Sequence, residues 1–386
     1  MKDYSYPSSL SFWEIKQYLL DIDLLIVGGG IVGLTTAIFF KQKNPKRKVV
    51  IVEKGVLPAG ASSKNAGFAC FGSPSEIFAD QKNTSEEHVY SLMEQRLNGL
   101  SELRNLVGDN NLNFEPCGGF ELFRDDETDL FNECLAFSEL ANKKLESKIG
   151  LKDTYTVADN RIKEFGFSGV KHLILNKHEG AIDTGKMIWH LHRLAVELGV
   201  MILNGTEVLS FNDCDDKVEI ELSGGIIIEA RNIHIAVNGF AKSLLPQLDV
   251  QPARAQVLIS SPIPELKIKG TFHLEEGFYY FRNVGNRVLF GGGRQLDFQG
   301  ETSEQLVTTE RIQDRLEELL ATTILPNTSY KIDHRWSGIM GVGKTKKSIV
   351  KRVSNNATCS VRLGGMGVAI GSLVGKEASE LVHDKG

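Results

Sequence analysis

Cysteine is scarce in this sequence, and long apolar runs are missing. The five cysteines are odd in number and form no C-x-x-C pair, which fits a reducing compartment better than a disulfide framework. No apolar run reaches the roughly 18 residues of a membrane span. The N-terminus also lacks the basic, apolar and small-residue order of a signal peptide. These absences predict a cytoplasmic protein without a transmembrane segment.

A large surplus of one charge is missing as well, and so are internal repeats and low-complexity segments. The net charge is only −5, so the composition indicates no polyanion partner and no nucleic acid. His190 and His192 are two residues apart and would not face one way on a helix, so no metal site is predicted. The chain has 386 residues, which suggests two or three domains at ~150 residues per domain.

The best-defined feature that is present lies at residues 23–53. An apolar strand leads into Gly28, Gly30 and Gly33 at G-x-G-x-x-G spacing; a helix and a second apolar strand follow, and that strand ends on Glu53. The first glycine permits a tight turn, the second lets backbone approach a pyrophosphate, and the third allows close helix–strand packing. The helix N-terminus offers free N–H groups to phosphates. Glu53 can accept hydrogen bonds from ribose hydroxyls and would repel a 2′-phosphate, which favours FAD or NAD over NADP.

A long loop of small residues follows this unit. Residues 55–76, GVLPAGASSKNAGFACFGSPSE, are rich in Gly, Ala and Ser and show little periodicity. Beside a nucleotide site, such a loop lets backbone lie against a flat cofactor, while a plain surface loop is the alternative.

This loop carries a family resemblance. Residues 60–67 read G-A-S-S-K-N-A-G, which resembles a segment of the FAD-dependent amine and amino-acid oxidoreductases of the D-amino-acid oxidase, glycine oxidase and sarcosine oxidase group. Residues 233–239 and 361–371 resemble further FAD-contacting segments of that group, so the resemblance covers almost the whole chain. It implies an α/β fold (α+β overall), with a Rossmann-like FAD-binding domain and a second, mixed-sheet substrate domain. The implied FAD-binding domain comprises residues 1–80, 150–245 and 331–386, and the substrate domain comprises residues 81–149 and 246–330.

The cofactor implied by the resemblance is FAD. Cys70 would lie near the flavin, where we expect a compact, unattached residue; a covalent link is the alternative. The residues predicted to bind FAD are Gly28, Gly30, Ile31, Val32, Gly33, Glu53, Lys54, Ala61, Ser62, Ser63, Asn65, Ala66, Gly67, Phe68, Val208, Asn238, Gly239, Gly338, Gly364, Gly365, Met366, Gly367 and Val368.

The substrate contacts are predicted on a β-hairpin over residues 277–294. By resemblance its aromatic strand walls the pocket above the flavin. Tyr279 matches a substrate-facing tyrosine of glycine oxidase-like members, and Arg282 is placed to meet a substrate carboxylate. These two residues are the predicted catalytic residues, and ordinary sheet packing is the alternative for each.

One departure from the family concerns the substrate. Glycine oxidases carry an arginine shortly after the W-A/S-G stretch that begins here at Trp336, and it clamps the amino-acid carboxylate. Met340 and Gly341 stand there in this chain. Arg282, Arg335 or Arg254 are the candidates to replace the clamp; otherwise the substrate lacks an α-carboxylate.

Two further segments carry weaker predictions. Lys344, Lys346 and Lys347 form a basic hairpin, expected to be a solvated turn, with an acidic partner or substrate as the alternative. Residues 11–14 have capping-box spacing and open a predicted helix to residue 20, whose aromatic residues are expected to cover the sheet.

The predicted function follows from the cofactor. A flavin accepts a hydride at N5 from a C–H bond beside a nitrogen or oxygen, and the protein supplies position and electrostatics. The predicted reaction is oxidation of a primary or secondary amine, an amino acid by preference, to an imine that water hydrolyses. Oxygen or another acceptor would then reoxidise the flavin. The alternatives are a dehydrogenase of a 2-hydroxy acid or polyol phosphate, and a flavin-binding protein without turnover.

Overall fold

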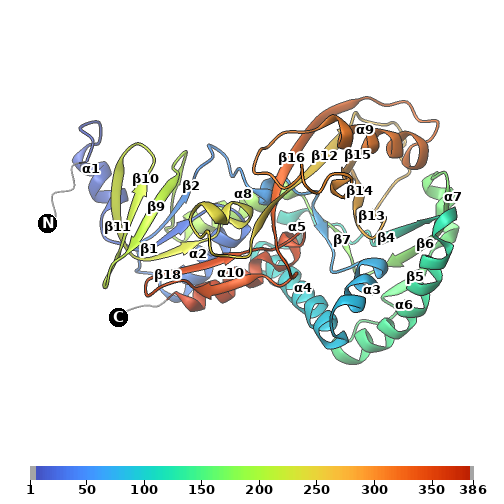
Figure 1. Ribbon diagram of the computed structural model, residues 1–386, viewed down its shortest axis with the longest axis horizontal. Helices are drawn as coiled ribbons and strands as arrows, with labels where there is room; N and C mark the ends of the chain where they lie inside the picture. The colour runs from blue at the N-terminus through green and yellow to red at the C-terminus, as the bar shows by residue number, and fades with distance from the viewer. Residues whose placement is uncertain (1–5, 383–386) are drawn as a thin grey trace.

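The structure, a computed structural model, describes residues 6–382. It contains two eight-stranded sheets and one two-stranded sheet. Figure 1 shows the two large sheets in the two halves of an elongated molecule, with both ends of the chain beside the first sheet. The described helices include none long and apolar enough to cross a bilayer. The predicted α/β fold with a second mixed sheet is confirmed.

The first sheet is built on the fingerprint unit. Its main path has the order β17-β18-β11-β1-β2-β8, in which β8, β2, β1, β11 and β18 run parallel. The antiparallel strands β9 and β10 extend it from β11. Its strands are β1 (Ile22–Val27), β2 (Val49–Glu53), β8 (Met201–Asn204), β9 (Val208–Asp213), β10 (Val218–Leu222), β11 (Ile226–Ile235), β17 (Ile349–Arg352) and β18 (Ala357–Val361).

Three helices cover one face of this sheet. They are α2 (Ile31–Lys43), α8 (Thr184–Glu197) and α10 (Gly367–Leu381). Nearly every residue of α2 is buried because this helix lies between the sheet, α8 and α10. Asp183 caps α8 by accepting a hydrogen bond from the Lys186 amide.

The second sheet is mixed and has the order β16-β12-β15-β14-β13-β4-β6-β5. Only the β13–β4 pair is parallel. Its strands are β4 (Gly119–Arg124), β5 (Tyr155–Val157), β6 (Val170–Asn176), β12 (Gln251–Ser260), β13 (Thr271–Leu274), β14 (Tyr279–Val284), β15 (Arg287–Gly292) and β16 (Ile332–Val342). The predicted hairpin over residues 277–294 is β14–β15.

Most of the remaining helices surround the second sheet or link the two halves, and the short α1 (Phe12–Glu14) lies beside the first sheet. The others are α3 (Pro74–Asn83), α4 (Glu86–Val107), α6 (Thr128–Ile149) and α9 (Glu310–Leu319), with the short α5 (Asp109–Leu112) and α7 (Ile162–Phe165). The small third sheet pairs β3 (Phe68–Ala69) with β7 (Gly180–Ala181), which fastens the end of the glycine-rich loop.

The predicted domain boundaries do not follow the sheets. Strands β5 and β6 pair with each other, and β6 also pairs with β4, although the prediction places residues 150–245 in the FAD-binding domain. Strand β16 pairs with β12 along its whole length, although residues 331–386 are predicted to belong there too. Both differences involve strands whose partners are distant in sequence.

The N-terminal prediction is partly wrong. The capping box of Ser11 and Glu14 is present, and the helix runs on as a wider turn over Ile15–Leu19. Phe12 and Trp13 are 65% and 72% exposed, so they do not cover the sheet. Leu19 makes the buried contact instead.

Candidate active site

The glycine turn between β1 and α2 has the geometry that its sequence predicts. Gly28 adopts φ +107° and donates its amide to Val52 O at 2.8 Å. A Cβ on Gly33 would lie 1.9 Å from Gly28 O, so the helix approaches the strand only because residue 33 has no side chain. Glu53 at the end of β2 accepts from the amides of Gly29 and Gly55, both at 2.9 Å. The turn is therefore fixed by its own backbone and by one carboxylate.

Two cavities open at this turn and share a wall. The smaller, about 100 Å³, is lined by Glu53, Lys54 and Val208 among others. The larger, about 510 Å³, extends toward the second sheet, and Gly30, Ala61, Ser62, Ala236 and Asn238 line both. All the residues predicted to bind FAD line one cavity or the other except Gly33, Ser63 and Gly239. Gly33 and Gly239 act instead through close backbone contacts, Gly239 against Met340 O, and the Ser63 hydroxyl donates to Pro58 O.

The N-termini of two long helices face the larger cavity. Ile31 and Val32 begin α2, and Gly367 and Val368 begin α10; all four line the cavity. The first turn of a helix carries amides without intrahelical acceptors and the positive end of the helix dipole. The pair fits a cofactor with two electron-rich parts: a pyrophosphate at α2 and a flavin pyrimidine edge at α10.

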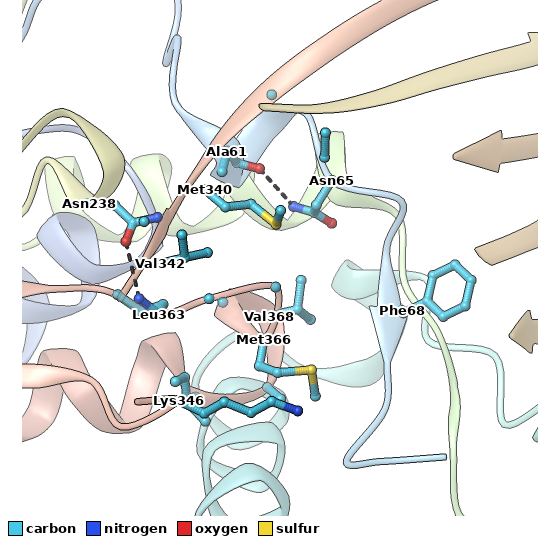
Figure 2. Close-up of a pocket in the computed structure, with 18 of the residues that line it drawn as sticks. Ala61, Asn65, Phe68, Asn238, Met340, Val342, Lys346, Leu363, Met366 and Val368 are labelled. Carbon is cyan, nitrogen blue, oxygen red and sulfur yellow. Dashed lines mark hydrogen bonds between the residues drawn. The ribbon is translucent and has the colours of Figure 1, made fainter. Parts of the chain in front are cut away.

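Asparagine side chains shape the backbone between these helices. Asn65 Oδ1 accepts from the Gly67 amide at 2.8 Å, and its Nδ2 donates to Ser62 O at 2.8 Å. Asn238 Oδ1 accepts from the Leu363 amide at 3.1 Å. Figure 2 shows Asn65 and Asn238 on either side of Met340, with Met366 and Val368 below and Phe68 at the far end.

The tip of the glycine-rich loop is held by a clamp that the sequence reasoning missed. Glu179 Oε1 accepts from the amides of Phe71 and Gly72 at 2.9 and 3.0 Å. Arg96 Nη1 donates to Phe71 O, and the Tyr155 hydroxyl donates to Gly72 O, both at 2.9 Å. Burial raises the pKa of Glu179 to about 7, even though the two backbone hydrogen bonds favour its ionised form. In the sequence, Glu179 only precedes a helix cap, and no local pattern marks it.

The predicted catalytic residues do not line the cavity. Tyr279 is 1% exposed and lies in the core of the second sheet. Successive side chains of a strand point to opposite faces, so the next residue points the other way. Tyr280 faces the cavity instead. Arg282 donates from Nη1 to Gly67 O and Ile182 O, both at 2.8 Å. Its guanidinium therefore supports the flavin loop from behind, and both predicted roles are corrected.

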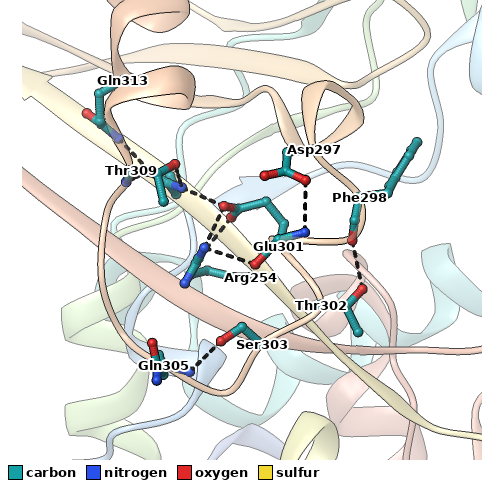
Figure 3. A network of polar contacts seen from close by, with 11 residues as sticks. Arg254, Asp297, Phe298, Glu301, Thr302, Ser303, Gln305, Thr309 and Gln313 are labelled. Carbon is teal, nitrogen blue, oxygen red and sulfur yellow. Dashed lines mark hydrogen bonds and ion pairs between the residues drawn. The ribbon is translucent and has the colours of Figure 1, made fainter.

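The other two arginines proposed as a carboxylate clamp are also occupied. Arg254 forms an ion pair with Glu301 at 2.7 Å, which Figure 3 shows within a wider polar network. Arg335 donates to Gln313 and Glu317, each at 2.7 Å. Neither arginine lines either of the two cavities described above. In the same network Gln256 Oε1 accepts from the Thr309 amide, and α9 begins at the next residue, Glu310.

The end of the larger cavity away from the FAD-binding turn is apolar and aromatic. Tyr280 packs edge-on against Phe68, with ring centroids 5.7 Å apart, and its cross-strand neighbour His273 does so at 5.1 Å. Burial raises the pKa of Tyr280 to about 12 and lowers that of His273 to about 4, so both side chains are neutral at pH 7. The same cavity is also lined by Leu92, Val257, Phe278, Phe298, Met340, Val342 and Met366.

A charged cluster lines a different part of the same cavity. Glu76 pairs with Arg96 at 3.2 Å and with Lys346 at 3.1 Å, and Lys346 also reaches Asp80. Burial alone would raise the pKa of Glu76, but the two cations outweigh it and hold that pKa at about 2. Lys344 and Lys347 are exposed, as expected of a solvated turn, whereas Lys346 of the same hairpin is paired.

Comparison with known proteins agrees with this site. The FAD dependent oxidoreductase (DAO) family profile matches residues 23–381. The sarcosine oxidase subunit beta of Rhodobacter capsulatus is 23% identical over 97% of this chain and 90% of its own. The L-2-hydroxyglutarate dehydrogenase of Indibacter alkaliphilus is 30% identical over a shorter stretch, 32% of this chain and 40% of its own. The solved glycine oxidase from Geobacillus kaustophilus has a TM-score of 0.73 at 18% identity, covering 94% of this chain and 95% of its own.

The matched residues include the glycine turn, the loop and the start of α10 that line the two cavities. The chain therefore belongs to the DAO family of FAD-dependent oxidoreductases, and it is an enzyme that uses FAD.

Proposed function

We propose that this enzyme oxidises a primary or secondary amine, and specifically an amino acid. The observation that carries the proposal is the apolar, aromatic end of the larger cavity, which directly adjoins the part lined by the predicted FAD residues. FAD supplies a two-electron acceptor there, because flavin N5 takes a hydride from a C–H bond beside nitrogen. The names of the glycine oxidase and sarcosine oxidase relatives support the same substrate class.

The chain's own residues hold the substrate rather than attack it. Phe68 and Tyr280 form a wall against which the reacting carbon can be placed, and water is excluded by the apolar residues around them. His273 is neutral at pH 7 because burial lowers its pKa to about 4. With a pKa this low the imidazole is a weak proton acceptor, so hydride loss depends on an amine that is already unprotonated. The amine then becomes an imine, which water hydrolyses, and two electrons pass on to oxygen or another acceptor.

A second candidate is oxidation of a 2-hydroxy acid. The observation that favours it is the 30% identity to an L-2-hydroxyglutarate dehydrogenase over 159 residues. Family membership argues against the third alternative, a flavin-binding protein without turnover.

Anaerobic mixing of the FAD-loaded protein with panels of amino acids, N-alkyl amino acids, amines and 2-hydroxy acids distinguishes the candidates. We expect an amino acid or amine to bleach the flavin absorbance, with release of ammonia or an alkylamine. Bleaching by hydroxy acids alone would replace the proposal with the second candidate. Recovery of the absorbance in air would identify oxygen as the acceptor, and persistent bleaching would indicate another acceptor.

A further inference from the structure

Three of the five lysine and arginine side chains that line the larger cavity are paired with acidic residues. Arg96 and Lys346 are balanced by Glu76 and Asp80. Arg362 forms an ion pair with Asp249 at 2.7 Å and also donates to the hairpin at Lys347 O and Thr345 Oγ1. These groups therefore have no charge left over for a ligand.

Two cations of the lining have no acidic partner in the part of the chain that the structure describes. Lys64 lies in the glycine-rich loop, its side chain near Gly338, on the FAD side of the cavity. Arg294 lies at the opposite side, immediately after β15, where Gly293 turns the chain with φ +81°. Only Arg294 is therefore placed to meet the substrate.

The side chain of Arg294 is held by an aromatic neighbour but lacks some of its hydrogen-bond partners. Its guanidinium stacks over the Phe298 ring, 5.0 Å from the centroid. Its Nε is buried and has no acceptor within residues 6–382, and the neighbouring Gln295 Oε1 is likewise buried without a donor. The nearby acid Glu301 is already bound by Arg254 and Gln256. A half-buried guanidinium without an ion pair carries a desolvation cost that a bound anion would offset.

We propose that Arg294 is the carboxylate anchor of this enzyme, and that its substrate is an amino acid with an apolar or aromatic side chain. The two Nη groups of Arg294 have no hydrogen-bond partner within residues 6–382, and such a pair can bind both oxygens of a carboxylate end-on. Phe278, Phe298 and Tyr280 line the same region and fit an apolar remainder. This inference rests on the proposed function, because it takes the ligand of the cavity to be the amino acid that is oxidised. It also accounts for Met340, which leaves the position of the usual clamp without charge.

Binding of a non-reacting carboxylate tests the anchor without requiring turnover. Benzoate is titrated into the FAD-loaded protein and its Kd is read from the change in the flavin spectrum, with benzamide as the uncharged probe of the same shape. We expect the wild type to bind benzoate at least tenfold more tightly than benzamide. Arg294→Met should weaken benzoate by at least tenfold and leave benzamide unchanged. The benzoate Kd of Arg294→Lys should lie between those of the wild type and Arg294→Met, because lysine keeps the charge but not the planar fork.

Arg193→Met is the matched control, since Arg193 is an exposed residue of α8 that stacks on Trp189. It should bind both probes as the wild type does. Arg294→Gln replaces the methionine variant if that protein does not retain FAD. An unchanged benzoate Kd in an FAD-loaded Arg294 variant would overturn the anchor, as would equal binding of benzoate and benzamide by the wild type. Failure of every amino acid to bleach the flavin would instead overturn the proposed function.

Discussion

At the scale of single residues, glycines of similar appearance differ in what surrounds them. Gly33 faces Gly28 O at a distance that no Cβ can occupy. A methyl group on Gly60, in the loop beside the same cavities, would have nothing within 4 Å, and this residue has an ordinary φ of −76°. The sequence presents both as loop or turn glycines, and only the packing distinguishes them.

Gly33→Ala should therefore sharply reduce FAD retention. The methyl group must push α2 away from β1, which moves the amides that face the cofactor, and overpacking of this kind costs about 1–3 kcal/mol of stability. The measurement is the ratio of flavin to protein absorbance after purification, with circular dichroism to check folding. Gly60→Ala is the control and should bind FAD normally. Full FAD content in a folded Gly33→Ala protein would show that this contact does not set the cofactor site.

The residues predicted to contact the substrate could not be placed from the sequence. The resemblance places Tyr279 in the pocket, but the strand turns Tyr280 toward it, and a shift of one residue exchanges the two faces of a strand. The arginines raise the same difficulty. Whether Arg254 or Arg294 is free depends on where Glu301 lies, 47 residues away from Arg254 in the sequence. No local pattern contains that information.

At the scale of elements, the tip of the glycine-rich loop depends on one buried carboxyl. Glu179 connects the loop to β7, and its acid form predominates below pH 7 because burial raises its pKa to about 7. Its folded-state pKa lies above the unfolded value of 4.5. The folded state therefore binds more protons, so the stability contributed by this group is greatest at low pH and declines as the pH rises from about 4.5 through 7.

Glu179→Gln should remove that decline. The amide oxygen can still accept from Phe71 and Gly72, so the clamp is kept while the ionisation is lost. We expect the variant to gain stability relative to the wild type between pH 5 and pH 8, by an amount of the order of 3 kcal/mol. Urea unfolding of the FAD-loaded proteins at several pH values measures the difference. Burial lowers the pKa of His234 and His273, so these two groups make the stability rise with pH below pH 6.5. Both proteins share this effect, and the difference between variant and wild type removes it.

The exposed Glu94 of α4 supplies the matched control for this experiment. Glu94→Gln should show the same pH dependence as the wild type. Parallel curves for Glu179→Gln and the wild type would mean that the carboxyl is ionised throughout the range, and the assigned pKa would then be wrong.

At the scale of the whole molecule, the sequence predicts the FAD half far better than the substrate half. The strand, glycine turn, helix and acid of residues 23–53 are local, so their geometry follows from spacing. The second sheet depends instead on pairings between distant segments, such as β6 with β4 and β16 with β12. The predicted domain boundaries depart from the sheets at those strands for this reason. The clamp at Glu179 and the partners of Lys346 also form only when distant segments meet.

Lys346 joins the two halves of the molecule. Its hairpin leads from β16 into β17 of the first sheet, and its partners Glu76 and Asp80 lie on α3. The hairpin lines the larger cavity together with the start of α10.

Lys346→Met should loosen the contact between the hairpin and α3 and speed FAD release severalfold, measured by the rise in flavin fluorescence after dilution. High salt should speed release from the wild type but have little effect on the variant, since part-exposed ion pairs are screened. Lys347→Met, an exposed neighbour on the same hairpin, should release FAD as the wild type does. Equal release from all three proteins would show that the hairpin does not retain the cofactor.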